Sequence, residues 1–402
     1  MIRFSSSSSK IKADKGFSLI ELIIVMGLLG ILLAITAGNF ATLLSSLKTT
    51  SKVAETEIEK IVGLDILRQD IEHTGYGLPW DIDTGNWGDI SYLEAASQNI
   101  CSSNNNISDY NDTTAPPRGI ISGDNVCDDG SDYLVIKSTV VRNNEEAQKW
   151  TYIWNDGSSN IVNIWASTTD NMDNSTKVIA INPKDNIRDK VLVTYLEGGS
   201  RKYYSPFGVN GQTVKTNYAL KPTEVFLLFG IGDDTSLRMP FNRADYYISR
   251  SNVPSRCAKG TGVLTKAIVS HSNGQLSDFS PLLDCVADFQ VVFGVDITTP
   301  SPDGIVDCYT NDLSNTGITD AENTRERVKE LRVYILAHEG QMDRNFRFDT
   351  NSIRVGDNSG LNVCGGSGVL GRDFNLTGIT NWQNYRWKVY TLVVLPDNLK
   401  GR

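Results

Sequence analysis

One carboxylate in the N-terminal part of the chain lies where a charged group is costly. Glu21 is the only ionisable residue in an apolar run that extends to about Phe40. A helix of about 24 residues rises roughly 36 Å, which is enough to cross the hydrocarbon core of a bilayer. A carboxylate at the centre of such a span costs on the order of 2.5–3.5 kcal/mol, and less near an end. Glu21 is therefore a candidate functional residue, and its natural partner is a positive charge at the same depth.

Cleavage of one peptide bond in this chain would supply such a charge. Hydrolysis between Gly16 and Phe17 creates a new α-amine four residues before Glu21. The first sixteen residues contain four basic residues and one acidic residue, which gives them a net charge of +3. Positive charge beside an apolar span stays on the cytoplasmic side. We therefore expect everything after Phe40 to be exported.

A conventional secretory signal is the alternative for this segment. Its apolar region has about 7–15 residues and is followed by a small-x-small cleavage site. In this chain the run is longer, it contains Glu21, and it ends in Ile35-Thr36-Ala37, which fits such a site poorly. We therefore favour a retained membrane helix.

The segment Gly16-Phe17-Ser18-Leu19-Ile20-Glu21-Leu22 resembles the processing motif of type IV prepilins and of type II secretion pseudopilins. The resemblance implies that a prepilin peptidase cuts after Gly16 and that the new N-terminal residue, Phe17, is methylated. It also implies that Glu21 pairs with the N-terminal amine of a neighbouring subunit during assembly. The alternative is a carboxylate that reaches the membrane interface or stays protonated.

A helical pattern continues after the apolar run. Apolar residues recur at spacings of three and four, which indicates an amphipathic helix: Ala54, Ile58, Ile61, Leu64, Leu67 and Ile71. No proline interrupts residues 1–78, and the glycines and proline of residues 74–79 are typical helix stop signals. We predict a cleaved leader at 1–16 and one helix from Phe17 to about His73. Its transmembrane half is residues 17–40, and its amphipathic half is the segment 41–75.

The end of this helix carries a second resemblance. Asp70-Ile71 followed by Gly75-Tyr76-Gly77 is similar to the minor pilins called PilW, and more distantly to the J-type pseudopilins. The C-terminal blocks 288–296, 328–337 and 385–395 extend the likeness. It implies a type IV pilin-like fold, in which a long N-terminal helix precedes a large globular head.

The head, residues 76–402, is predicted to be rich in β-strands. Residues 80–130 are polar and lack periodicity, as is usual for an insertion or a binding loop. Runs of β-branched and aromatic residues bounded by turn residues then indicate strands, and one charged segment, Ala321–Leu331, indicates a short helix. We expect an α+β fold with antiparallel sheets. The predicted strands lie at 133–136, 149–154, 161–165, 191–195, 224–229, 246–248, 289–295, 331–336 and 385–394.

The charge of the chain limits its partners. Acidic residues outnumber basic ones by 47 to 38, and removal of the leader changes the net charge from −9 to −12. A general nucleic-acid-binding protein needs a basic surface. We therefore expect no nucleic acid partner.

Six cysteines stand in the part of the chain that we expect to be exported, and none form a Cys-x-x-Cys pair. Zinc ribbons and thioredoxin chemistry are therefore disfavoured, and up to three disulfides are the natural expectation. Proximity along the chain favours Cys101–Cys127 and Cys285–Cys308, which leaves Cys257–Cys364. Free buried thiols are the alternative.

One acidic loop could bind calcium. Asp296, Asp303 and Asp307 surround Gly304 in a flexible segment, and calcium prefers several oxygen ligands in such a loop. Residues 124–132 form a second candidate with a similar composition. The alternative for both is an Asp/Gly turn between strands. No other cofactor is expected.

Catalysis finds little support in the sequence. His73, His271 and His338 are scattered, and no nucleophile elbow or phosphate-binding loop is present. One aromatic group could stack on sugars, although such residues more often pack into a core: Trp150, Tyr152, Trp154 and Trp165.

These observations together favour a non-enzymatic minor pilin that helps to initiate type IV pilus assembly, at the pilus tip. We expect its helix to pack against other minor pilins and the major pilin, and we expect contact with the prepilin peptidase and the inner-membrane assembly platform. Before assembly the helix would span the inner membrane with the head in the periplasm, and afterwards the protein would lie in the pilus at the cell surface. The alternatives are a J-type pseudopilin of a type II secretion system and a tip adhesin or other ligand-binding pilin.

Overall fold

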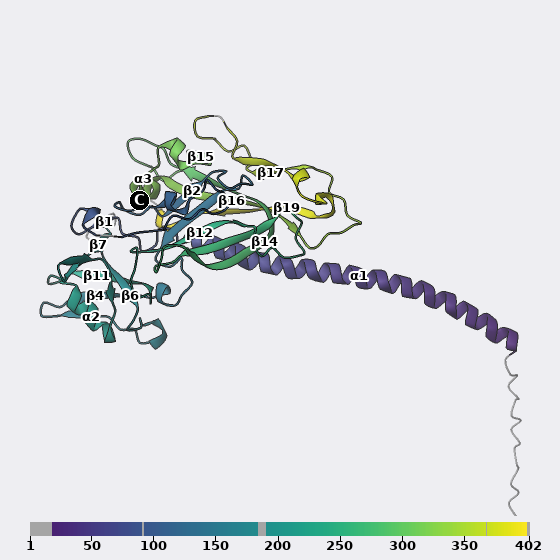
Figure 1. Ribbon diagram of the computed structural model, residues 1–402, viewed down its shortest axis with the longest axis horizontal. Coiled ribbons are helices and arrows are strands. Elements are labelled where there is room, and N and C mark those ends of the chain that lie inside the picture. The colour runs from purple at the N-terminus through teal and green to yellow at the C-terminus, as the bar shows by residue number, and fades with distance from the viewer. Residues whose placement is uncertain (1–17, 91, 184–189, 367, 400–402) are drawn as a thin grey trace, which may run out of the picture. The chain divides into compact units, whose positions relative to one another are not determined.

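The computed structural model describes residues 18–90, 92–183, 190–366 and 368–399, with the side chains of residues 38, 39 and 41–60 left out. The chain divides into two compact units, with the boundary between Glu55 and Thr56. In the first unit the described residues from Leu19 onward are helical, and the second unit contains the end of that helix and the sheets (Figure 1).

Helix α1 (Leu19–Glu72) is continuous over 54 residues. The predicted helix end at His73 is therefore correct to one residue, whereas the predicted start at Phe17 lies outside the described residues. Gly75 and Gly77 follow the helix with φ angles of 79° and 68°. These left-handed conformations suit glycine, which explains why the stop signals act at this point.

Among the described residues, the larger sheet has eight strands in the order β19-β16-β14-β13-β12-β3-β2, with β15 paired to β14. Its pairs are antiparallel. Its strands are β2 (Ile120–Gly123), β3 (Tyr133–Ser138), β12 (Asn242–Ser249), β13 (Gly262–Val269), β14 (Leu276–Val295), β15 (Cys308–Thr310), β16 (Val328–Glu339) and β19 (Arg386–Val394).

Strand β14 contains several bulges, and two of them follow one another closely at Cys285 and Ala287. Cys285, with φ of 61°, is the extra residue against β13, because Asp284 pairs with Val263 and Val286 pairs with Gly262. The register with β16 then shifts between Val286 and Asp288. Bulges bend a strand and increase its twist. This long strand can therefore pair with β13 along its first half and with β16 along its second.

The smaller sheet has seven strands within the described residues, in the order β1-β7-β6-β11-β4-β5, with β10 paired to β6. Its pairs are antiparallel except that β1 runs parallel to β7. Its strands are β1 (Asp81–Ile82), β4 (Trp150–Asn155), β5 (Asn160–Val162), β6 (Lys177–Asn182), β7 (Val191–Val193), β10 (Ser205–Pro206) and β11 (Val225–Gly232).

The described head also contains two hairpins, two short α-helices and several 3₁₀ helices of three or four residues. The hairpins are β8 (Tyr195–Glu197) with β9 (Ser200–Lys202), and β17 (Ser352–Gly356) with β18 (Gly371–Asn375). The α-helices are α2 (Gln212–Asn217) and α3 (Ala321–Arg327). The predicted helix over Ala321–Leu331 is thus shorter than expected, because Val328 already pairs with β14 at the start of β16.

Four buried clusters hold these layers together. The end of α1 packs on one face of the larger sheet. The opposite face packs in part against the smaller sheet and the polypeptide of residues 78–126, and in part against the β17–β18 hairpin. The outer face of the smaller sheet is covered by α2. The expected α+β fold, a long N-terminal apolar helix followed by a large β-rich head with mainly antiparallel sheets, is confirmed.

Candidate functional site

Helix α1 begins with a capping box. The Oγ atom of Ser18 accepts a hydrogen bond from the N–H of Ile20 at 3.4 Å, and Oε2 of Glu21 accepts one from the N–H of Ser18 at 3.2 Å. This reciprocal pair satisfies two N–H groups at the start of the helix, which have no partner within the helix itself. This capping role of Glu21 was not expected from the sequence. The available signal was a serine three residues before the glutamate.

The other predicted N-terminal site residues are not described. Gly16 and Phe17 lie outside the described residues, so cleavage and methylation stay predictions. The pairing of Glu21 with a neighbour's amine also stays a prediction. The bond to Ser18 uses one carboxylate oxygen, Oε2.

The apolar part of α1 is uncovered in the isolated chain. Residues Leu19–Ala37 form a helical stretch of 19 residues with a mean hydropathy of 2.7, and none of it is buried. Its length of about 28 Å matches the roughly 30 Å core of a bilayer. An exposed apolar surface of this size indicates a membrane or other helices as its surroundings. Together with the basic N-terminal segment, this supports membrane anchoring.

The end of α1 approaches the larger sheet through a glycine. A Cβ atom placed on Gly63 would lie 1.7 Å from the carbonyl oxygen of Leu282, in the backbone of β14. The helix and the strand are therefore in backbone contact at this point, and only glycine fits. Leu67 and Ile71 follow on the same side and are fully buried. Burial of each such side chain contributes about 1.5–3 kcal/mol.

An ion pair fixes the same end of the helix. Asp70 Oδ2 accepts hydrogen bonds from Lys266 Nζ and from the hydroxyl of Tyr246, each at 2.7 Å. Lys266 and Tyr246 face each other across the β12–β13 pair. Burial raises the pKa of Asp70, and the attraction of Lys266 opposes that rise. Breaking such a buried pair on one side leaves an uncompensated charge, which is strongly destabilising.

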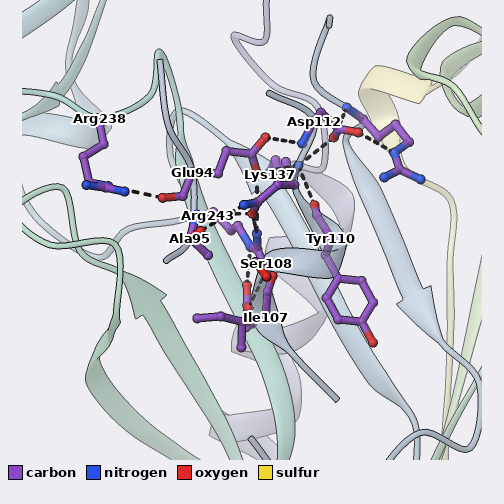
Figure 2. Close-up of polar contacts among 12 residues, drawn as sticks. Glu94, Ala95, Ile107, Ser108, Tyr110, Asp112, Lys137, Arg238 and Arg243 are labelled. Carbon is purple, nitrogen blue, oxygen red and sulfur yellow. Dashed lines mark hydrogen bonds and ion pairs between the residues drawn. The ribbon is translucent and has the colours of Figure 1, made fainter. Parts of the chain in front are cut away.

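A second buried network anchors the long polar segment to the larger sheet (Figure 2). Lys137 on β3 contacts Glu94 at 2.7 Å and Asp112 at 2.6 Å. Arg243 on β12 donates to Asp245 at 2.8 Å and to the carbonyl oxygen of Ile107 at 2.8 Å. Burial alone would raise the pKa of Asp112, but Lys137 and Arg118 outweigh it, so the pKa is lowered. The charges are paired, so this cluster acts as a structural anchor.

The six cysteines form three disulfides, and only one predicted pairing is correct. Cys101–Cys127 forms as expected, with Cα atoms 5.0 Å apart. The predicted pairs Cys285–Cys308 and Cys257–Cys364 are wrong. The observed pairs are Cys257–Cys285 and Cys308–Cys364.

The length of β14 explains this error. Cys308 on β15 pairs with Val295, which lies ten residues beyond Cys285 along β14. Ten strand residues span about 33 Å, so two cysteines that are close in sequence are far apart in space. Cys364 instead lies beside β15, because its N–H donates to the carbonyl oxygen of Tyr309.

The three aspartates of the first calcium candidate shape their own loop. Asp296 Oδ2 accepts from the N–H of Gly304 at 2.6 Å, and Asp307 Oδ2 accepts from the N–H of Ile297 at 2.8 Å. Asp303 Oδ1 accepts from the N–H of Ile305 at 2.9 Å. In the second candidate, both oxygens of Asp132 accept backbone N–H bonds. Calcium binding stays a prediction for both loops, and calorimetric titration with Ca²⁺ tests it.

The histidines lie apart from one another. Within the described residues, the one group of ligand atoms close enough to hold a metal is that of Cys257, Cys285 and His338. Because both cysteines belong to a disulfide, they offer no thiolate to a metal. His271 is buried and accepts a hydrogen bond from the N–H of Arg238.

The four aromatic residues Trp150, Tyr152, Trp154 and Trp165 do not pack into a core, although such residues more often do. In the described residues, the four buried clusters contain none of them. The rings instead contact one another beside the smaller sheet.

Comparison with known proteins bears on the N-terminal segment. Residues 11–37 match the prokaryotic N-terminal methylation motif. The matched segment contains Gly16, Phe17 and Glu21 and the whole exposed apolar stretch of α1, Leu19–Ala37. No curated protein and no solved structure matches the chain.

Proposed function

We propose that this chain, which is a type IV pilin-like protein, is a non-enzymatic minor pilin that helps to initiate type IV pilus assembly, at the pilus tip. The observation that carries the proposal is the N-terminal methylation motif of residues 11–37. The motif implies processing by the prepilin peptidase and assembly with other pilins. Cleavage after Gly16 would create a new amine on Phe17, four residues before Glu21. This spacing suits the pairing of the amine of one subunit with the carboxylate of a neighbouring subunit.

The uncovered apolar surface of α1 supplies the attraction between subunits. Leu19–Ala37 would pack against the equivalent helices of neighbours after leaving the bilayer. The pairing of Glu21 with a neighbour's Phe17 amine would set the axial register, since a misplaced subunit leaves both charges unpaired in a low dielectric. The capping bond from Ser18 would hold the carboxylate ready for that contact.

The head supports a position at the tip. More than three hundred residues follow α1, and their described part contains two large sheets, two hairpins and three disulfides. A head of this size is a steric obstacle to regular repetition along a narrow shaft. We therefore place the protein at low copy number in a priming complex, with the helix in the inner membrane and the head in the periplasm until assembly begins.

Complementation of a deletion strain tests this function. The wild-type chain should restore surface pili, whereas Glu21→Ala should insert into the membrane and fail to restore them. Asp65→Ala is the matched control, because Asp65 is an exposed acid on the same helix outside the apolar stretch. Normal piliation by Glu21→Ala would contradict the proposed role of this carboxylate.

The same strain separates the pilus from the secretion alternative. A minor pilin predicts that deletion removes pili and leaves protein secretion intact. Loss of secretion with normal pili would instead identify a J-type pseudopilin.

A further inference from the structure

Four aromatic rings form a continuous row along one edge of the smaller sheet. The ring of Trp165 lies 5.3 Å from that of Trp150 and 6.2 Å from that of Tyr152, and the ring of Tyr152 lies 5.4 Å from that of Trp154. Trp150, Tyr152 and Trp154 alternate along β4 and so share one face. We call these four residues the aromatic row.

The aromatic row lies at the solvent-exposed end of a sheet face that is otherwise buried. Across the β4–β11 pair, Trp150 is opposite Phe229 and Tyr152 is opposite Leu227, so their side chains lie on the same side. Phe229 belongs to the buried cluster between the two sheets, and Leu227 packs against that cluster. The aromatic row lies beyond that cluster, and Trp150 is 42% exposed. Tyr152, Trp154 and Trp165 are half-buried beside it. A contiguous apolar patch at the surface marks an interaction site.

A hollow of about 790 Å³ opens beside the row and is lined by Trp150 and Trp165. This volume lies in the usual range of small-ligand sites, about 300–1,000 Å³. The remaining lining residues are polar or charged: Glu145, Gln148, Lys149, Thr168, Thr169, Asp170 and Asp173.

The wall of the hollow is held in place by the chain itself. Asn171 accepts from the N–H of Trp165 at 2.8 Å and donates to the carbonyl oxygen of Trp165 at 2.9 Å. The next residue, Met172, is buried in the cluster that covers the outer face of the smaller sheet. Trp165 Nε1 donates to the carbonyl oxygen of Trp150 at 2.9 Å, which fixes the two indoles together. A preorganised wall reduces the entropy lost on binding.

The charge of the rim restricts the ligand. Three carboxylates, those of Glu145, Asp170 and Asp173, face one ammonium, that of Lys149. Within the described residues none of these four groups forms an ion pair. The acids repel phosphates and acidic saccharides. Asp170 Oδ1 accepts from the hydroxyl of Thr169 at 3.2 Å, and because a carboxylate has about four acceptor positions, capacity remains for hydrogen bonds from a ligand.

We propose that this hollow binds a neutral saccharide. A pyranose ring presents an apolar face of C–H groups and a rim of hydroxyls. The apolar face stacks on the indole of Trp150, and the hydroxyls donate to the carboxylates of Asp170 and Asp173. Threonine hydroxyls at 168 and 169 supply further hydrogen bonds. The site would give a pilin-like chain a means of contacting glycans, in addition to its role in assembly.

An oligosaccharide array tests this inference on the full chain. The protein is purified in a detergent without a sugar headgroup, because such headgroups would compete for the site. Immobilised neutral and acidic oligosaccharides are the probes, and the strongest neutral one is then titrated by calorimetry. We expect the wild type to retain neutral oligosaccharides in preference to acidic ones.

Two substitutions at one position and one control localise the binding. Trp150→Ala should weaken the titrated affinity by about tenfold or more, as loss of one aromatic stacking contact does, and Trp150→Phe should recover part of it. Phe279→Ala is the matched control, because Phe279 is an aromatic residue that is 56% exposed on the larger sheet. It should bind as the wild type does. Circular dichroism confirms that each variant is folded.

Three results would overturn the proposal. They are no retention of any neutral oligosaccharide, preference for acidic ones, and an unchanged affinity in Trp150→Ala. Selective capture of a protein partner through the aromatic row, without saccharide binding, would identify a protein interface instead. None of these results depends on pilus assembly, so they leave the proposed function of the chain untouched.

Discussion

Asp70 Oδ2 lies 2.7 Å from Lys266 Nζ and 2.7 Å from the hydroxyl of Tyr246. This contact ties the last turns of α1 to the centre of the larger sheet. Lys266 is almost completely buried, so it has little access to water if its partner is removed. The carboxylate therefore fixes the end of the helix on the head, close to the point where Gly63 meets Leu282.

Asp70→Ala should destabilise the head by about 3–5 kcal/mol, because it leaves the Lys266 ammonium buried and unpaired. Replacing both partners, as in Asp70→Ala with Lys266→Met, should recover much of that loss. Asp65→Ala, at an exposed position on the same helix, should change stability by about 0.5 kcal/mol or less. Urea unfolding of the wild type, the two single variants Asp70→Ala and Lys266→Met, the double variant and the Asp65→Ala control measures the coupling. Additive effects of the two substitutions would show that the pair does not act as a unit.

Gly63→Ala should also destabilise the head, because the new Cβ would overlap the carbonyl oxygen of Leu282. Overpacking of this kind costs about 1–3 kcal/mol, and more when backbone must move. Gly30→Ala is the control, because a Cβ at Gly30 meets nothing within 4 Å. Thermal unfolding should show a lower midpoint for the first variant alone. Equal midpoints would mean that α1 and β14 are not in backbone contact.

His271 should make the head less stable in mild acid. Its Nδ1 accepts from the N–H of Arg238 at 3.2 Å, and its Nε2 lies 3.1 Å from Oδ1 of Asn242. Burial and the repulsion of Arg142 and Arg238 lower the pKa of His271 to about 4, although the attraction of Asp234 opposes this shift. The unfolded chain binds the proton near pH 6.5, so stability is lost as the pH falls from about 6.5 toward 4.

This loss amounts to about 2 kcal/mol between pH 7 and pH 5. The measurement is the free energy of unfolding in urea at the two pH values, for the wild type and for His271→Gln. The variant cannot take up this proton. It should therefore lose about 2 kcal/mol less over the same interval, whatever its stability at pH 7. The same pH dependence in both proteins would show that His271 is not held neutral.

Mass spectrometry of unreduced proteolytic fragments should recover Cys257 joined to Cys285 and Cys308 joined to Cys364. Loss of the second bond, in Cys308→Ala with Cys364→Ala, should cost about 2–4 kcal/mol of stability. A fragment that joins Cys285 to Cys308 would contradict the strand arrangement of β14 and β15.

The sequence predicted the features that rest on local periodicity. The apolar run and the stripe through Leu67 and Ile71 predicted α1 to within one residue at its end. Each predicted strand segment also proved to contain a strand. These patterns arise because a side chain's burial follows its position on a helix or strand. The segment Leu276–Asp288 was missed as the start of β14, because Asp278, Pro281 and Asp284 interrupt its apolar alternation.

The features that depend on distant parts of the chain were not predicted. Asp70 lies three residues after Leu67, within the apolar stripe of the helix. A carboxylate at such a position is expected to be buried and paired, and this was the one local indication that Asp70 has a partner. The partner, Lys266, lies 196 residues away. The pairs Cys257–Cys285 and Cys308–Cys364 and the exposure of Trp150 depend likewise on which strands become neighbours. No local pattern records that choice.

The most direct test of the account is to identify the N-terminus of the chain in assembled pili. Pili sheared from cells are digested, and the N-terminal peptide is analysed by mass spectrometry. We predict a chain that begins with N-methylated Phe17 in the wild-type pili, and no such chain in the sheared fraction from cells that carry Glu21→Ala, where the protein should stay in the membrane. A chain that retains residues 1–16, or one that is absent from wild-type pili and present only in the membrane, would contradict it.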